Sequence, residues 1–150
     1  MLFLFLKNIG IQDYKSMNKV LNIDSNIDYI ASLVVGHLIP ELYEDEVYLW
    51  EIVSVLRYLS TQNSEIESNI NLVEHDAEFV KKVMIAAVGQ ILILPGIETF
   101  LTGWPLEGDW EPRRLTISVS DIMETIRLQL DQLGREPVAL EIAFFRGVES

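Results

Sequence analysis

The spacing of apolar residues predicts a helix that begins near Asp24 and ends near Ile39. Asp24, Ser25 and Asn26 are candidate N-cap residues, because their side chains can accept hydrogen bonds from the first free backbone N–H groups. A proline disfavours the helical conformation of the residue before it, so we expect this helix to end or kink at Pro40. Apolar residues recur three or four positions apart on its buried face, at Ile27, Ile30, Ala31, Val34, Val35 and Leu38.

Two long central helices are expected after this point. The first begins at Pro40, since proline suits the first turn of a helix, and it runs to about Leu59. Its first turns are acidic, which the positive end of the helix macrodipole favours. The second begins near Asp76 and ends at about Leu94, where a proline–glycine pair follows. The acids in the first turns of the first central helix are Glu41, Glu44, Asp45 and Glu46.

Shorter segments predict a small sheet. Leu2–Leu6 is an apolar run of strand length, and Leu115–Val119 alternates apolar and hydroxyl residues, the period of a half-buried strand. Val138–Phe145 is expected to form the last strand, and Asp13–Leu21 a short helix. Between the two late strands, a helix is indicated by the apolar stripe Ile122, Ile126, Leu130 and Leu133, an N-cap at Ser118 or Ser120, and Gly134 after its end.

These elements predict a helix-rich α+β fold in a single globular domain that spans residues 1–150. The fold has two long central helices and a small sheet, which combines the N-terminal strand with a C-terminal strand–helix–strand unit. A parallel pairing of the two late strands through their helix would be a right-handed crossover.

Composition excludes several classes of function. The chain has 150 residues, no cysteine, and a formal net charge of −12, and 49% of its residues are hydrophobic. So many apolar residues argue against a disordered acidic tail. Without cysteine there is no disulfide framework, no thiolate metal site and no thiol nucleophile. A chain this acidic is not expected to bind nucleic acid, since phosphate contacts need clustered Lys and Arg.

The negative charge is concentrated in one part of the chain. Between Val20 and Val80 there are twelve acids and one base, Arg57, which gives −11. The remaining residues contain eleven acids and ten bases, which gives −1. Segregated charge of this kind attracts cationic partners and repels anionic ones.

Candidate catalytic and metal-binding residues are few. The sequence contains neither a phosphate-binding loop nor a nucleophile elbow. We interpret His37 as a partly buried structural residue and His75 as part of a solvated helix start, because two histidines cannot complete the usual ligand sets. We therefore expect no enzyme activity, no metal and no cofactor, although a catalytic carboxylate pair among the 23 acids stays open.

One acidic segment combines carboxylates with aromatic rings. On a single helix, Glu44, Tyr48 and Glu51 would share a face, and Glu46 and Trp50 would form a second pair one turn apart. Carboxylates bind Lys and Arg, and rings add rigid apolar area. The alternatives are a solvated helix N-terminus and a different interface in the loop from Trp104 to Trp110. The predicted partner-binding residues are Glu41, Tyr43, Glu44, Asp45, Glu46, Tyr48, Trp50 and Glu51.

A small, acidic, cysteine-free chain without a catalytic signature resembles bacterial immunity proteins, which neutralise toxins made by the same strain. The resemblance implies an inhibitor that covers the basic active site of a toxin, such as a nuclease. The alternatives are an enzyme or ligand-binding domain with a carboxylate-lined pocket, and a homodimer or other assembly subunit. We expect a cytoplasmic protein, because the apolar start has no export signal and the stretch 83–97 is too short to span a membrane.

Overall fold

The computed structural model describes residues 23–62, 76–103, 105 and 111–148. Its helices are α3 (Ile23–Glu44), α4 (Leu49–Gln62), α7 (Ala77–Leu92) and α8 (Val119–Leu133). Its strands are β1 (Val47–Tyr48), β2 (Ile97–Leu101), β3 (Arg113–Leu115) and β4 (Ala143–Gly147). The helix-rich α+β fold is therefore confirmed. Five predicted features lie outside the described residues, namely the strand Leu2–Leu6, the helix Asp13–Leu21, His75, Trp104 and Trp110.

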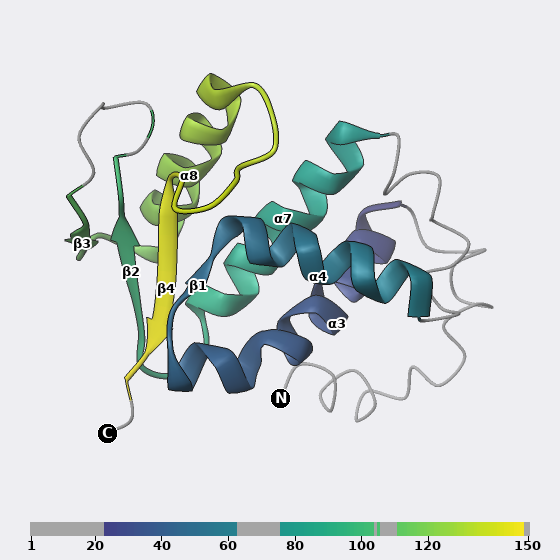
Figure 1. Ribbon diagram of the computed structural model, residues 1–150, viewed down its shortest axis with the longest axis horizontal. Coiled ribbons are helices and arrows are strands. Elements are labelled where there is room, and N and C mark those ends of the chain that lie inside the picture. The colour runs from purple at the N-terminus through teal and green to yellow at the C-terminus, as the bar shows by residue number, and fades with distance from the viewer. Residues whose placement is uncertain (1–22, 63–75, 104, 106–110, 149–150) are drawn as a thin grey trace.

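The four described strands form an antiparallel sheet at one side of the molecule (Figure 1). Their order is β1-β4-β2-β3, so that the last strand of the chain lies in the interior of the sheet. Phe145 of β4 pairs with Val47 of β1 on one side and with Thr99 of β2 on the other. Because β2 separates β3 from β4, the two late strands do not form the parallel crossover unit. The strand β2 was not predicted.

The core lies where the helices meet this sheet. The helix α3 packs against α7, α4 and β4, and Figure 1 shows these helices extending away from the sheet. The predicted buried face of α3 is confirmed, because all six of its apolar positions are buried. Local signals mark the bounds of α7 and α8 as predicted. Asp76 caps α7 by accepting from the Phe79 N–H at 3.1 Å, Ser118 caps α8, and Gly134 ends α8 with a φ of 69°.

The predicted helix boundary at Pro40 is wrong. The helix α3 continues through Pro40 to Glu44, and α4 begins only at Leu49. Proline removes the hydrogen bond to the carbonyl four residues earlier, here that of Gly36. Gly36 and Pro40 both lie on the exposed side of α3, where water can satisfy that carbonyl. Burial of Leu42, two residues past Pro40, favours continuation of the helix.

Two strand predictions have the wrong bounds. The strand β3 ends at Leu115, and Val119 is the first residue of α8. Ile117 and Val119 are exposed, so their alternation with hydroxyl residues does not mark a buried strand face. The last strand begins at Ala143, five residues later than predicted.

The residues before β4 form a tight loop instead of a strand. Ala139 and Ile142 have φ values of 48° and 69°, which non-glycine residues rarely adopt. The buried carboxylate of Glu141 holds the loop closed. It accepts two hydrogen bonds from the Arg135 guanidinium, at 2.8 and 2.6 Å, and one from the Val138 N–H at 2.6 Å. These charged hydrogen bonds offset the backbone strain.

Candidate protein-binding surface

The predicted acidic residues lie at the C-terminal end of α3 and in the short link to β1. Glu41, Glu44 and Asp45 are exposed, and Glu46 is half-buried. We call these four residues the acidic surface. The prediction placed them at a helix N-terminus, which is the opposite end. At a helix C-terminus the macrodipole is negative, so acids there are unfavourable by about 0.3–1 kcal/mol each. The last turn of α3 contains no basic residue to offset this.

The link between α3 and α4 is held by side chains of the predicted site. Glu51 occupies the third position of α4, and its Oε2 accepts a hydrogen bond from the Tyr48 backbone N–H at 2.6 Å. This is the arrangement in which a glutamate in the first turn caps its own helix. The Tyr48 hydroxyl donates to Oε2 of Glu46 at 2.9 Å. Glu46, Tyr48 and Glu51 therefore form one hydrogen-bonded group at the start of α4.

Burial, together with nearby negative charges, raises two pKa values in this group. Burial is the main cause that raises the pKa of Glu51 from its ordinary 4.5 to about 7, and the Tyr48 N–H opposes it. A hydrogen bond with the Glu41 carboxyl and the charges of Glu41 and Asp45 raise the pKa of Glu51 further. Burial, the hydrogen bond to Glu46 and the nearby carboxylates raise the pKa of Tyr48 to about 12. At pH 7, Glu51 is therefore about half protonated, whereas a solvated carboxyl would be almost fully ionised.

The three predicted aromatic residues have different surroundings. Tyr43 packs within the fold, because its ring covers Gly147 and its hydroxyl donates to the Pro95 carbonyl at 2.5 Å. Tyr48 is half-buried against the ring of Phe144, with the ring centroids 5.0 Å apart. Trp50 has 41% of its surface exposed. Of these three rings, Trp50 is the one that the fold presents to solvent.

The proposed common helical face does not form. Glu44 is the last residue of α3, Tyr48 belongs to β1, and Glu51 lies in α4. The spacing of a single helix therefore does not relate them. Tyr48 and Glu51 still lie near one another, since the Tyr48 N–H donates to Glu51 and the charge of Asp45 acts on the pKa of both groups.

Two exposed aromatic rings, one on α3 and one on α4, were not predicted as site residues. His37 of α3 and Tyr58 of α4 are both exposed, and their ring centroids lie 5.9 Å apart. The interpretation of His37 as partly buried is wrong. Because α3 continues through Pro40, His37 lies one turn before Glu41 on the same face. The recurrence of Trp50, an exposed serine and Tyr58 every four residues was the signal that could have identified this face.

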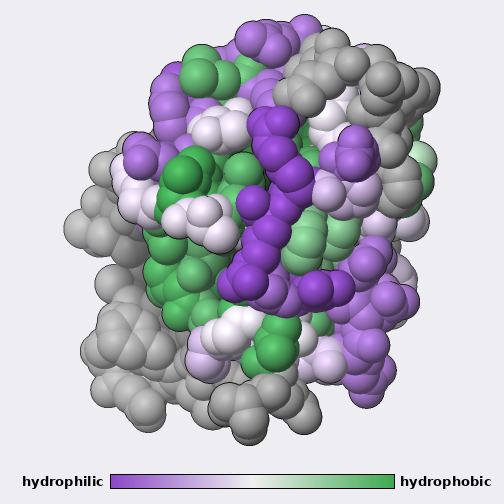
Figure 2. Space-filling model, turned by 90° about the vertical axis from the view of Figure 1, so that its left-hand side faces the viewer, coloured by the Kyte–Doolittle hydropathy of each residue, from purple (hydrophilic) through white to green (hydrophobic). Residues whose placement is uncertain are grey.

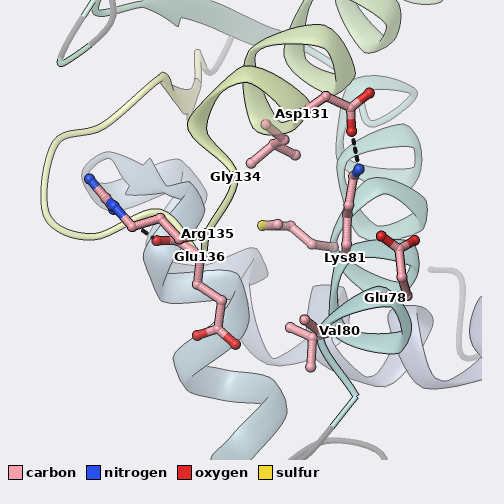
Figure 3. Close-up of a pocket in the computed structure, with 10 residues that line it drawn as sticks. Glu78, Val80, Lys81, Asp131, Gly134, Arg135 and Glu136 are labelled. Atoms are coloured by element: carbon pink, nitrogen blue, oxygen red, sulfur yellow. Dashed lines mark hydrogen bonds and ion pairs between the residues drawn. The ribbon is translucent and has the colours of Figure 1, made fainter.

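A separate cavity of about 230 Å³ lies between the first turns of α7 and the end of α8 (Figure 3). Val80, Met84 and Leu130 contribute its apolar lining. Lys81 forms an ion pair with Asp131 across one side, whereas Arg135 extends away from the cavity. Its other charged residues are Glu78, at the start of α7, and Glu136, which pairs with Arg57.

This cavity offers no general acid at Asp131. The hydrogen bond and charge of Lys81 hold the pKa of Asp131 below its usual range, so the carboxyl stays ionised. A general acid needs the opposite shift. Within the described ranges, no group of three or more His, Asp or Glu side chains is placed to hold a metal ion.

Basic residues gather at the β3 edge of the sheet, opposite the edge that β1 forms. Figure 2 views this side and shows a band of strongly hydrophilic side chains between hydrophobic ones. The strand β3 exposes Arg113 and Arg114 there. Glu98 of β2 pairs with Arg114 at 3.0 Å and with Arg146 at 3.1 Å. The guanidinium of Arg146 also lies 4.7 Å from the centroid of the Phe100 ring. The acidic surface and this basic edge thus belong to different parts of the fold.

None of the described helices is long and apolar enough to cross a membrane. Comparisons with protein-family models, with characterised proteins and with solved structures find no match to this chain.

Proposed function

We propose that this chain is an acidic inhibitor that binds a cationic protein, as immunity-type proteins do, and covers its basic active site. A toxin with nuclease activity is the kind of partner that fits. The observation that carries the proposal is the position of the acidic surface at the negative end of α3. There the macrodipole and the carboxylates add to the same negative potential.

Folding does not account for these acids. A helix N-terminus would benefit from them, but a helix C-terminus does not. Within the part of the chain that the structure describes, the acids held in ion pairs are Glu98, Glu124, Asp131, Glu136 and Glu141. All of these lie outside the acidic surface. A binding role supplies the cationic partners that the described part of the fold does not.

The proposed mechanism is occlusion. Lys and Arg side chains around the partner's active site bind the carboxylates of the acidic surface and exclude the anionic substrate. Long-range attraction between the charged surfaces accelerates the encounter, and added salt screens it over about 8–10 Å. We therefore expect association to slow markedly as the ionic strength rises.

Two triple variants test the proposal. In the first, Glu41, Glu44 and Asp45 are replaced by lysine. In the control, the exposed acids Asp28, Glu78 and Glu111, which lie elsewhere on the chain, are replaced by lysine. Both variants undergo the same change in net charge, so any difference between them depends on position.

Each variant is immobilised and exposed to lysate from cells that express the chain naturally, and retained proteins are identified by mass spectrometry. We expect a basic protein that the wild type and the control retain and the first variant loses. The purified partner should lose its activity when mixed with equimolar wild type. Retention of the same proteins by both variants would exclude the acidic surface as the interface.

A further inference from the structure

The outer face of α4 presents two aromatic rings to solvent. Trp50 and Tyr58 have 41% and 55% of their surface exposed, and exposed Ser54 lies midway between them. Because these residues are four positions apart, they follow one stripe along the helix. Large exposed rings arranged on one face are typical of binding surfaces.

Carboxylates border one end of this stripe. The two residues of β1 join the acidic surface to α4, and the Glu41 carboxyl of α3 is close enough to act on Glu51, the residue after Trp50. At the other end, the His37 ring of α3 lies beside the Tyr58 ring. Arg57 is the one base of α4, and its guanidinium pairs with Glu136. The carboxylates therefore favour a cationic occupant at the Trp50 end of the stripe, and at the other end the Tyr58 ring is the group that would bind one.

Rings combined with carboxylates select guanidinium over ammonium. A guanidinium is planar and weakly hydrated, so it can stack on a ring while its N–H groups bind a carboxylate. The ammonium of lysine is compact and strongly hydrated. The fold itself contains the first arrangement, where Arg146 lies over the Phe100 ring and its Nε donates to Glu98 at 3.1 Å.

The spacing of the two rings defines the spacing of the cations. Trp50 and Tyr58 are eight positions apart, which is about 12 Å along a helix axis and about 80° around it. An extended segment advances about 3.3 Å per residue, and its alternate side chains point to the same side. Two side chains four residues apart are thus about 13 Å apart and face the same way.

The geometry points to the outer face of α4 as the docking site for an extended segment of the partner that carries two arginines four residues apart. This inference rests on the proposed function, in that the partner is cationic. It adds the chemical identity of the cations and their separation.

The test uses four glycine–serine peptides and the isotope-labelled full chain. The first peptide has two arginines four residues apart, the second has two lysines at the same positions, the third has two adjacent arginines, and the fourth has none. Binding is followed at low salt by NMR through the backbone amides of α4. We expect the first peptide to bind about fivefold more tightly than the second or the third.

Alanine variants of the two rings test whether the preference for arginine depends on them. We expect Trp50→Ala and Tyr58→Ala each to weaken the first peptide about threefold and to leave the lysine peptide unchanged. Leu128→Ala removes an exposed apolar side chain of α8 and is the matched control. All three side chains lie at the surface and none belongs to the buried core, so the variants should fold.

Equal affinity for the arginine and lysine peptides would overturn the inference, but the proposal of a cationic partner would stand. Peptide-induced changes outside α4, or no binding of any peptide, would also overturn it. The charge-reversal experiment would then judge the proposed function separately. Loss of binding in the charge-reversed chain, together with arginine preference in the wild type, would support both.

Discussion

Replacement of Glu51 by glutamine should make the protein more stable at pH 8 and remove part of its pH dependence. The folded state raises the pKa of Glu51 from 4.5 to about 7. Between these values the folded chain keeps a proton that the unfolded chain releases. The stabilisation due to this proton is complete below pH 4.5 and is lost as the pH rises through 7. Glutamine does not ionise, so at every pH it mimics the protonated form of Glu51.

Glutamine also preserves the local geometry. Its amide oxygen can accept from the Tyr48 N–H, as Oε2 of Glu51 does at 2.6 Å. Its amide N–H can donate to the Glu41 carboxylate, as a protonated carboxyl does. The substitution therefore removes the ionisation and keeps the cap of α4.

The magnitude follows from the two pKa values. The difference between 4.5 and about 7 corresponds to ~3.4 kcal/mol for a carboxyl that is withheld from water. Glu51 is only half-buried, and solvent screening reduces this to about 1 kcal/mol. For a chain of this size, about 1 kcal/mol raises the unfolding midpoint by about 2–4 °C.

The assay is urea unfolding of the wild type and of Glu51→Gln at several values from pH 5 to pH 8. We expect the two free energies of unfolding to converge near pH 5 and to separate by about 1 kcal/mol at pH 8. Glu78→Gln is the control, since Glu78 is an exposed acid in the first turn of α7. The pKa values of Glu141 and Asp131 are lowered, so these carboxyls titrate below pH 5 and do not contribute to the difference measured here. Parallel curves, or a less stable Glu51→Gln at pH 8, would refute the reasoning.

Four further substitutions test the fold around the surface by thermal or urea unfolding. Pro40→Ala should stabilise α3 by about 1–3 kcal/mol, because alanine restores the missing helical hydrogen bond, and a loss of stability would mean that proline is needed there. Gly147→Ala should destabilise by more than about 1 kcal/mol, because a Cβ would fall 2.2 Å from the Tyr43 ring; an unchanged midpoint would contradict that contact. Ser118→Ala should cost about 1 kcal/mol through loss of the cap of α8, and no change would show that the cap is dispensable. Glu44→Lys should raise stability by about 0.3–1 kcal/mol, since it places a cation at the negative end of α3; destabilisation would mean that Glu44 has a folding role.

Elements with local signals could be predicted from the sequence. The helix α7 combines an N-cap aspartate with a proline–glycine stop, and α8 combines the Ser118 cap with Gly134 in the left-handed conformation. Each of these signals acts within a few residues. The buried face of α3 was also predictable, because helical periodicity depends only on the spacing of apolar residues.

Features that depend on distant residues could not be predicted in this way. The strand β1 has two residues, and it forms because Val47 and Tyr48 pair with Phe145 and Phe144, almost a hundred positions later. Pro40 is tolerated because of burial on both sides of it, which no local rule detects. The acidic residues of the site were identified, but their place at the wrong end of a helix followed from the error at Pro40.

Several features at the junction of α3 and α4 oppose stability. Acids lie at the negative end of a helix, Glu51 is held where its ionisation is unfavourable, and Trp50 leaves a large ring in water. Violations of local rules tend to concentrate at functional sites. A cationic partner would reverse each of these effects, because its guanidinium groups would neutralise the acids, favour the ionised form of Glu51 and cover the ring. The features that cost stability in the free chain are thus the ones that would contribute most to binding.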